Sequence, residues 1–171
     1  MTYTSSVSRK EKLLYLLDQS SNSNRIIGRK KLMKLVFFAE HYDPDEDELV
    51  SEPQLDLFDF EIFKYGPFSK KVLDDFDQLK NQNDLFEDSS RMQYLIKVTA
   101  DGSEKTEDIG ENLPEEEKMH LEKISREFSD KSGSELENLS LEMLGIKKRE
   151  KDRYRGMSIS SIIDGATPIE Q

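Results

Sequence analysis

An acidic stretch, residues 43–61, contains the side chains whose spacing comes nearest to a metal site. Three carboxylates in it are spaced like the first ligands of an EF-hand calcium loop, and they are Asp43, Asp45 and Asp47. That loop requires glycine at its sixth position and glutamate at its twelfth, where this sequence has Glu48 and Gln54. The stretch holds nine acids and no Lys or Arg, so we interpret it as a solvated acidic loop.

Other residues that commonly carry catalysis are sparse. His41 and His120 are the only histidines, and the chain has no cysteine. Two isolated imidazoles rarely form a metal site or a general base, so we expect structural or surface roles for both. The sequence also lacks a glycine-rich phosphate loop, a GxSxG elbow and an HExxH motif. We therefore predict a protein that is not an enzyme and that uses no metal and no cofactor.

A basic cluster begins the helix that periodicity predicts over residues 29–42. The side chains expected on its outer face are Arg29, Lys30, Lys31 and Lys34. One interpretation is a contact with phosphate or with an acidic partner. The other is a solvated helix face that the nine acids of residues 43–61 neutralise. The sequence leaves both interpretations open.

The motif Tyr65-Gly66-Pro67-Phe68 follows a strand-like alternation in which Phe58, Phe60 and Ile62 share one face. Because a residue before proline favours an extended conformation, we expect Gly66 to end that strand. The motif then reads as a rigid elbow that aims Tyr65 or Phe68 at a partner as an aromatic anchor. The alternative is that both rings fill the core.

A helix predicted over residues 69–80 has the place of a recognition helix, and residues 84–98 that of a wing. Its first turn offers Ser69, Lys70 and Lys71 to a nucleic acid, and the tip of the hairpin offers Arg91. Acids one turn later oppose binding to phosphate, and they are Asp74, Asp75 and Asp77. The position therefore suits DNA recognition better than the side chains do.

These motifs need elements to hold them. We predict helices at 9–20, with a capping box from Ser8 to Glu11, and at 114–129, then one that starts with a box from Ser134 to Glu137 and stops at Gly145. A hairpin is expected over 84–102. The fold class is α+β, with a winged-helix-like N-terminal core in the order helix, helix, strand, helix, hairpin, followed by C-terminal helices.

The predicted organisation is a core at 1–110, a helical extension of the same domain at 111–156 and a partly disordered tail at 157–171. The basic run 147–155 alternates with acids, which favours a solvated helix over a nucleic-acid tail. The 171 residues carry a net charge of −11, with no apolar run long enough for a membrane span and no secretory signal. We expect a cytoplasmic protein, and the sequence leaves its oligomeric state open, a dimer included.

Three segments resemble the YwgA-like proteins of bacteria and archaea, and they are IIGRKKLMKLVFF (26–38), DFEIFKYGPFSKKV (59–72) and YLIKVTADG (94–102). More distantly, the basic helix and the Gly-Pro turn are similar to the Panacea domains of SocA-like antitoxins. The resemblance implies a regulatory, antitoxin-like role and a protein partner such as a toxin or a regulator. We expect a non-catalytic regulatory domain that recognises a protein partner, and the alternative is a DNA-binding winged-helix transcriptional regulator.

Overall fold

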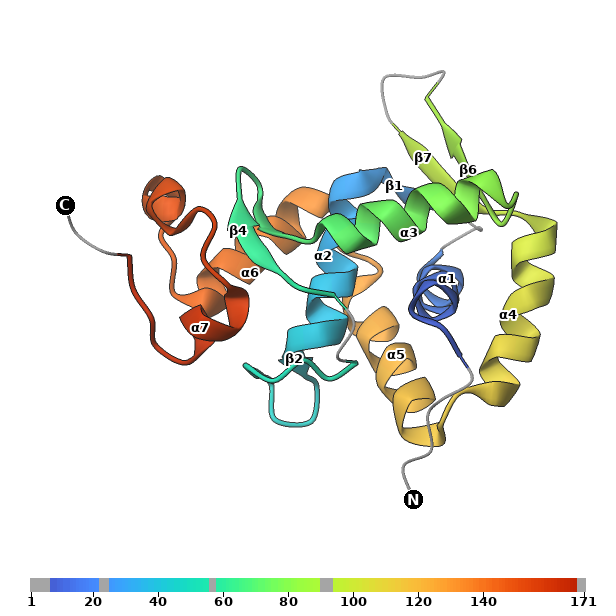
Figure 1. Cartoon of the computed structure of the whole chain (residues 1–171), viewed down its shortest axis with the longest axis horizontal. Helices are drawn as coiled ribbons and strands as arrows, with labels where there is room; N and C mark the ends of the chain where they lie inside the picture. The colour runs from blue at the N-terminus through green and yellow to red at the C-terminus, as the bar shows by residue number, and fades with distance from the viewer. Residues whose placement is uncertain (1–6, 22–24, 56–57, 90–93, 169–171) are drawn as a thin grey trace.

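The computed structural model describes residues 7–21, 25–55, 58–89 and 94–168. Helix α2 (Gly28–His41) runs through the centre of the molecule, with other helices and a β-hairpin around it (Figure 1). Every residue of α2 from Leu32 to His41 is buried. A helix that is apolar on nearly all sides has to be covered on all of them. In this fold α1 (Arg9–Ser20), α5 (Glu115–Phe128), α6 (Gly133–Leu144) and the hairpin supply that cover.

Helix α1 has the predicted bounds and the predicted capping box. The Ser8 hydroxyl oxygen accepts a hydrogen bond from the Glu11 backbone N–H, and a Glu11 carboxylate oxygen accepts one from the Ser8 N–H. The box closes two backbone donors that a helix start leaves open. Leu13, Leu14 and Leu17 are buried where α1 packs against α3 (Lys70–Asn81), α4 (Ala100–Asn112) and α5.

A small antiparallel sheet has the strand order β1-β7-β6. Strand β1 (Arg25–Ile27) pairs with β7 (Leu95–Val98), which pairs on its other side with β6 (Leu85–Asp88). The hairpin predicted over residues 84–102 is therefore present but shorter, because the chain enters α4 at Ala100. Thr99 caps α4 through a bond from the Gly102 N–H to its hydroxyl oxygen. This helix was not predicted, because its sequence ADGSEKTEDIGEN has a single large apolar residue, Ile109, and therefore no clear apolar periodicity.

A second hairpin joins β4 (Glu61–Phe63) to β5 (Gly66–Phe68) through the turn residues Lys64 and Tyr65. The predicted alternation is confirmed, since Phe58, Phe60 and Ile62 are buried. The expectation that Gly66 ends the strand is wrong. Gly66 has φ +89, which side chains with a Cβ rarely adopt, and this conformation lets the chain fold back and pair again with β4. Two further strands of two residues each pair elsewhere, β2 (Tyr42–Asp43) with β3 (Glu48–Leu49).

The C-terminal part covers one side of α2 and one edge of β4. Helices α5 and α6 were predicted, but the capping box of α6 runs from Ser132 to Glu135 instead of from Ser134 to Glu137. Gly145, with φ +73, ends α6 as predicted. A 3₁₀ helix, η1 (Lys148–Tyr154), and the short α7 (Ile159–Ile163) follow. Between them the chain pairs with β4 through a bridge from Ser158 to Glu61.

The fold is thus a mixed helix-and-strand domain, as the α+β prediction states. The division at residues 110 and 156 stays a prediction. In the residues that the structure describes, no helix is both long enough and apolar enough to cross a membrane.

Candidate functional site

A small pocket of about 190 Å³ opens beside the β4–β5 hairpin. Its wall combines cationic side chains with aromatic rings, and the lining residues are Lys34, Phe63, Lys64, Tyr65, Gly66, Phe68 and Arg155. We call it the hairpin pocket. The pocket therefore brings together three residues that were predicted to bind a partner, Lys34, Tyr65 and Phe68, from two distant parts of the sequence.

Lys34 is the most unusual of these residues. Its side chain is buried, with 2% of the residue exposed, and its Nζ donates a hydrogen bond of 2.7 Å to the carbonyl oxygen of Pro67. Burial lowers the pKa of Lys34 to about 7, while the nearby Glu137 carboxylate acts in the opposite direction. The prediction that Lys34 lies on the outer face of its helix is therefore wrong, because α6 and the hairpin cover that face.

The aromatic residues of the turn are open to solvent. Tyr65 is 53% exposed and Phe63 36% exposed, whereas Phe68 is half-buried and packs against the core. The rings of Phe63 and Phe68 meet edge to face with centroids 5.1 Å apart. Tyr65 therefore suits the predicted anchor role by its exposure, and Phe68 combines a core contact with a place in the pocket wall.

Cations surround the Tyr65 ring. The Nζ of Lys30 lies 4.8 Å from the ring centroid and that of Lys64 lies 5.4 Å from it. Lys30 also lies 3.5 Å from Oε1 of Glu137, a carboxylate that is 5% exposed. That oxygen accepts no hydrogen bond among the described residues. Lys30 thus pairs with Glu137, the acid whose charge acts on Lys34, and also lies over the Tyr65 ring.

Arg155 comes from the far C-terminal end of the chain. The segment that follows it pairs with β4, since the Gly156 N–H donates to the Ile62 carbonyl at 2.7 Å and the Ile62 N–H donates to the Met157 carbonyl at 3.1 Å. These bonds bring Arg155 to the pocket wall. Three residues of the pocket wall were not among the predicted binding residues, and they are Phe63, Lys64 and Arg155. The signal for Phe63 was present, since it is an aromatic residue on the strand face opposite to Phe60 and Ile62.

The comparison with known families decides what kind of domain this is. The model of the family described as "Antitoxin SocA-like, Panacea domain" matches residues 32–143, which is roughly two thirds of the chain. The chain belongs to this family. No curated protein matches the sequence. The predicted resemblance to Panacea domains is thus confirmed, and the resemblance to YwgA-like proteins stays a prediction.

The matched part of this Panacea domain contains most of the hairpin pocket, including Lys34, Tyr65 and Phe68. Arg155 lies beyond the match, as does Lys30. The pocket is therefore lined mainly by residues within the matched segment, together with Arg155.

The other predicted binding residues do not form one face with the pocket. Arg29 makes a two-pronged contact with Glu87 on β6, with both N–O distances at 2.8 Å, and this contact together with Lys80 lowers the pKa of Glu87 to about 2. Lys31 donates to the Ser129 carbonyl at the end of α5. The acidic loop does not neutralise Arg29 or Lys30, because their partners are Glu87 and Glu137.

At the start of α3, Lys70 is exposed and Lys71 pairs with Asp59 at 2.6 Å. Ser69 is buried, and its side chain makes no capping bond to the helix that it precedes. Arg91 lies outside the described residues. The predicted cluster at this helix is therefore divided between a solvated lysine, an ion pair and a buried hydroxyl.

Both histidines of this Panacea domain contact backbone carbonyls. Nδ1 of His41 lies 2.9 Å from the Val50 oxygen, and Nε2 of His120 lies 2.7 Å from the Ala39 oxygen. Burial lowers the pKa of His41. Within the described part of the chain, no group of three or more His, Cys, Asp or Glu side chains is placed to hold a metal ion.

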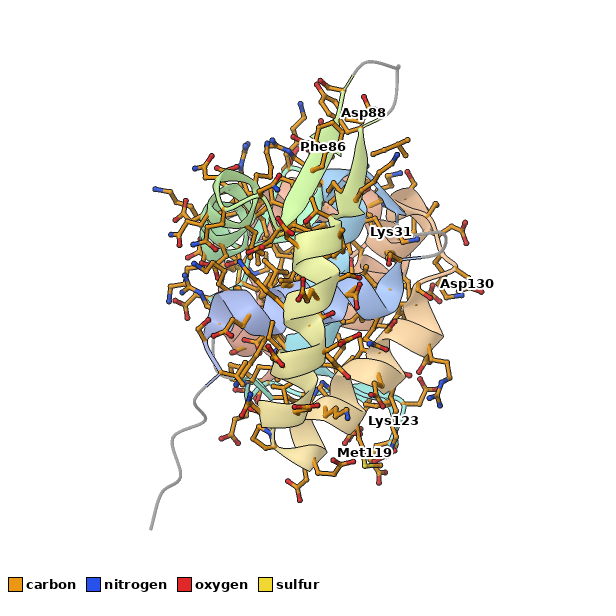
Figure 2. All side chains as sticks on the ribbon, turned by 90° about the vertical axis from the view of Figure 1, so that its right-hand side faces the viewer. Lys31, Phe86, Asp88, Met119, Lys123 and Asp130 are labelled. Atoms are coloured by element: carbon orange, nitrogen blue, oxygen red, sulfur yellow. The ribbon has the colours of Figure 1, made fainter. Side chains whose placement is uncertain are left out.

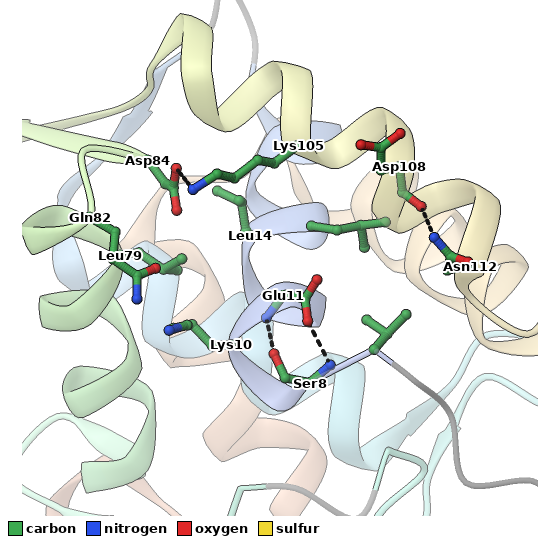
Figure 3. A pocket seen from close by; sticks show the side chains of 12 residues that line it. Ser8, Lys10, Glu11, Leu14, Leu79, Gln82, Asp84, Lys105, Asp108 and Asn112 are labelled. Carbon is green, nitrogen blue, oxygen red and sulfur yellow. Dashed lines mark hydrogen bonds and ion pairs between the residues drawn. The ribbon is translucent and has the colours of Figure 1, made fainter.

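A larger cavity of about 420 Å³ lies between α1, the end of α3 and α4 (Figure 3). Some of the charged groups in its wall bind other residues of the same wall. Asp84, 2% exposed, pairs with Lys105 at 2.8 Å, and Ser8 and Glu11 are held in the capping box. No predicted site residue lines it, because one of its walls is the helix α4 that the sequence did not reveal.

Exposed apolar side chains elsewhere are more scattered. Figure 2 shows Phe86 near one end of the molecule and Met119 at the other, on the face that α4 and α5 form. Tyr94, 56% exposed, belongs to the segment that leads into β7. The hairpin pocket is the place where exposed rings, a cavity and a buried cation coincide in the described residues.

Proposed function

We propose that this Panacea domain is a non-catalytic, antitoxin-like regulator that works in the cytoplasm by binding a protein partner such as a toxin. The observation that carries the proposal is the hairpin pocket, where Tyr65 and Phe63 stand exposed beside Lys34, Lys64 and Arg155. Family membership supports an antitoxin-like role. The pocket supplies a place where such a partner can dock.

The chemistry of the pocket resembles that of binding hot spots. Interfaces draw most of their energy from a few large aromatic and arginine side chains around a desolvated centre. Tyr65 supplies a rigid ring whose face is already polarised by Lys30 and Lys64. In a chain of net charge −11, a local group of cations also favours approach by an acidic surface.

The arrangement of α1, β1, α2, α3, β6 and β7 supports a winged-helix interpretation of the core. A strand between the first two helices pairs with the second strand of the hairpin, which gives the sheet order β1-β7-β6. In that interpretation α3 would face DNA. Its exposed surface carries Asp74 and Asp77, while Lys71 is paired with Asp59, so we place protein binding ahead of DNA binding.

The test compares two exposed tyrosines. Tyr65→Ala removes the proposed anchor, and Tyr94→Ala removes a ring of similar exposure, 56% against 53%, on another element. Each variant is co-expressed with the candidate toxin encoded nearest to the gene, and growth and the affinity of the purified pair are measured. We expect Tyr65→Ala to weaken binding by about tenfold or more and to abolish growth rescue, with Tyr94→Ala unchanged.

Phe63→Ala provides a second variant at the pocket. Its ring is partly exposed and contacts Phe68, so its loss should weaken the same interaction without removing a buried core side chain. Equal affinities for the wild type and both pocket variants would refute docking at the hairpin. Loss of rescue in Tyr94→Ala alone would move the interface to the β6–β7 hairpin.

A further inference from the structure

The hairpin pocket contains a buried amine, that of Lys34, which pairs with no carboxylate among the described residues. Lys34 is 2% exposed, bonds to the Pro67 carbonyl, and forms no ion pair among the described residues. The acid that acts on it, Glu137, lies nearest to Lys30. A buried charge without a counter-ion is costly, and an anion entering the pocket would relieve that cost. Lys64 and Arg155 add positive charge to the same wall, and no described acid lines it.

The backbone edges of the hairpin exclude one mode of binding. A partner often adds a strand to an open sheet edge. The outer edge of β4 is taken by residues 156–159, with the Ile159 N–H bonded to the Phe60 carbonyl at 3.0 Å. Strand β5 packs against α2 and α6. An occupant of the pocket therefore enters as a side chain or as the end of a chain.

We propose that the hairpin pocket binds the C-terminal residue of the protein partner. This inference rests on the proposed function and specifies how the partner is held. A cavity of about 190 Å³ has room for one residue. Its wall carries cationic and aromatic side chains, which favour a ligand with both an anionic and an apolar group. A C-terminal residue carries a carboxylate and an apolar side chain on the same carbon. An internal Asp or Glu would need a second residue to supply the apolar contact.

The two kinds of side chain in the pocket wall contact different groups of the bound residue. The α-carboxylate lies toward Lys34, with Arg155 able to form a two-pronged contact from the rim. The last side chain lies against Phe63 and Phe68, and Tyr65 covers it from the turn. Charge-assisted hydrogen bonds of this kind give the carboxylate its selectivity over an amide.

The test uses three peptides on the full-length protein. They are acetyl-Gly-Gly-Phe with a free carboxylate, the same peptide with a C-terminal amide, and acetyl-Gly-Phe-Glu-Gly-amide, which carries its acid internally. Affinity is measured by NMR titration, with shifts mapped to the hairpin. We expect the free acid to bind at least about tenfold more tightly than either of the others. Equal binding of acid and amide, or preference for the internal acid, would overturn the proposal.

Variants separate the charge from the fold. Lys34→Met should reduce the preference for the free acid to about twofold or less. Lys34→Met alters a buried residue, so a second variant is made at an exposed position, Arg155→Gln. It should reduce the preference for the free acid over the amide by about threefold or more. Lys71→Gln, at an exposed ion pair outside the pocket, is the control and should change nothing. An unchanged preference in both pocket variants would contradict the assignment.

The full-length partner distinguishes this inference from the function that it rests on. Extending the partner's C-terminus by a few glycines should weaken its binding about tenfold. If the extended partner still binds and remains sensitive to Tyr65→Ala, the docking site stands and the chain-end inference fails. If the partner binds equally to wild type and to Tyr65→Ala, the proposed function itself fails.

Discussion

Nζ of Lys34 and the carbonyl oxygen of Pro67 lie 2.7 Å apart, and this hydrogen bond joins the centre of α2 to the second strand of the hairpin. Proline has no N–H, so its carbonyl is the one backbone group that it can offer to a partner. The bond fixes the hairpin on the central helix. It also holds the Lys34 amine in the wall of a pocket that the rings of Phe63, Tyr65 and Phe68 line as well.

The burial of Lys34 predicts a pH dependence of stability. Its pKa is lowered from 10.5 to about 7 in the folded protein, so between these values the unfolded state binds more protons. The free energy of unfolding should therefore rise with pH from about 7 toward 10.5, by an amount on the order of a few kcal/mol in total. Below pH 7 Lys34 is charged in both states and the destabilisation is complete. Urea denaturation at pH 7.0 and pH 9.5 measures the rise.

Lys34→Met is the control for that dependence, because it keeps the length of the side chain without the charge. The variant also leaves the Pro67 carbonyl without its donor, a loss that does not vary with pH. The free energy of unfolding of the wild type should consequently rise relative to that of Lys34→Met between pH 7.0 and pH 9.5. The range stops at pH 9.5 because the pKa values of Tyr15 and Tyr42 are raised, which costs stability above their ordinary values. A constant difference would show that Lys34 does not titrate as proposed.

The contact between Arg29 and Glu87 predicts a second pH dependence of stability, in the acidic range. The pKa of Glu87 is lowered to about 2, mainly by its hydrogen bonds from Arg29. This stabilisation is present above pH 4.5 and is lost as the pH falls toward 2. Glu87→Gln should lower the free energy of unfolding at pH 7 by about 1–2 kcal/mol, since the half-exposed Arg29 weakens the pair through solvent screening.

Denaturation at pH 7 and pH 2.5 checks this, with Glu104→Gln on the exposed face of α4 as the matched control. The difference between wild type and Glu87→Gln should shrink at the lower pH, while the control should stay within about 0.5 kcal/mol of wild type at both. An equal effect of the two substitutions at pH 7 would contradict a structural role for the Arg29 contact.

The local signals in the sequence predicted most of the helices. The spacing of Leu13, Leu14 and Leu17 and the Ser8–Glu11 box define α1 because both act within a few residues. Helix α4 escaped prediction because Thr99 caps it directly after a strand, so helix and hairpin signals overlap. The box at Ser134 was misplaced by two residues because Glu137, which suits a cap by its spacing, is buried against α2 and only Glu135 is free to cap.

The candidate site was predicted in part for the same reason. Tyr65 and Phe68 lie next to each other along the chain, and their turn was visible from Gly66 and Pro67. Whether Lys34 points outward or inward depends on what covers α2, which periodicity does not report. Arg155 reaches the pocket through strand pairing with Ile62, more than ninety positions away, and no local pattern reveals such a partner.

Gly102 provides a test of how α4 is seated on the sheet. A Cβ at this position would collide with the backbone carbonyl oxygen of Asp84, which accepts a hydrogen bond from the Thr99 N–H at 3.1 Å. Backbone cannot swing aside as a side chain does, so Gly102→Ala should destabilise the protein by about 1–3 kcal/mol despite the better helix propensity of alanine. Gly110→Ala on the same helix meets the Tyr15 ring at 3.2 Å and is the matched control.

The free energy of unfolding of Gly110→Ala should lie within about 1 kcal/mol of the wild-type value, because the Tyr15 ring can shift slightly and alanine favours the helix. Both free energies come from urea denaturation under the same conditions. Similar values for the two variants would show that α4 can move away from Asp84 at little cost.

The surface of α3 predicts weak binding to DNA. Asp74 and Asp77 are exposed on the helix that a winged-helix protein would lay in the major groove, and Lys71 is held by Asp59. A phosphate approaching this face would meet carboxylates within a few ångströms, and repulsion offsets the charge of Lys70. We expect no complex with a random duplex of about 30 base pairs below roughly 10⁻⁴ M protein at low salt.

Fluorescence anisotropy measures this, with D74N/D77N as the informative variant, since removing both acids should strengthen binding measurably. Tight wild-type binding that falls steeply with salt and disappears when Lys70 and Lys71 are both replaced by glutamine would establish DNA recognition by α3 instead.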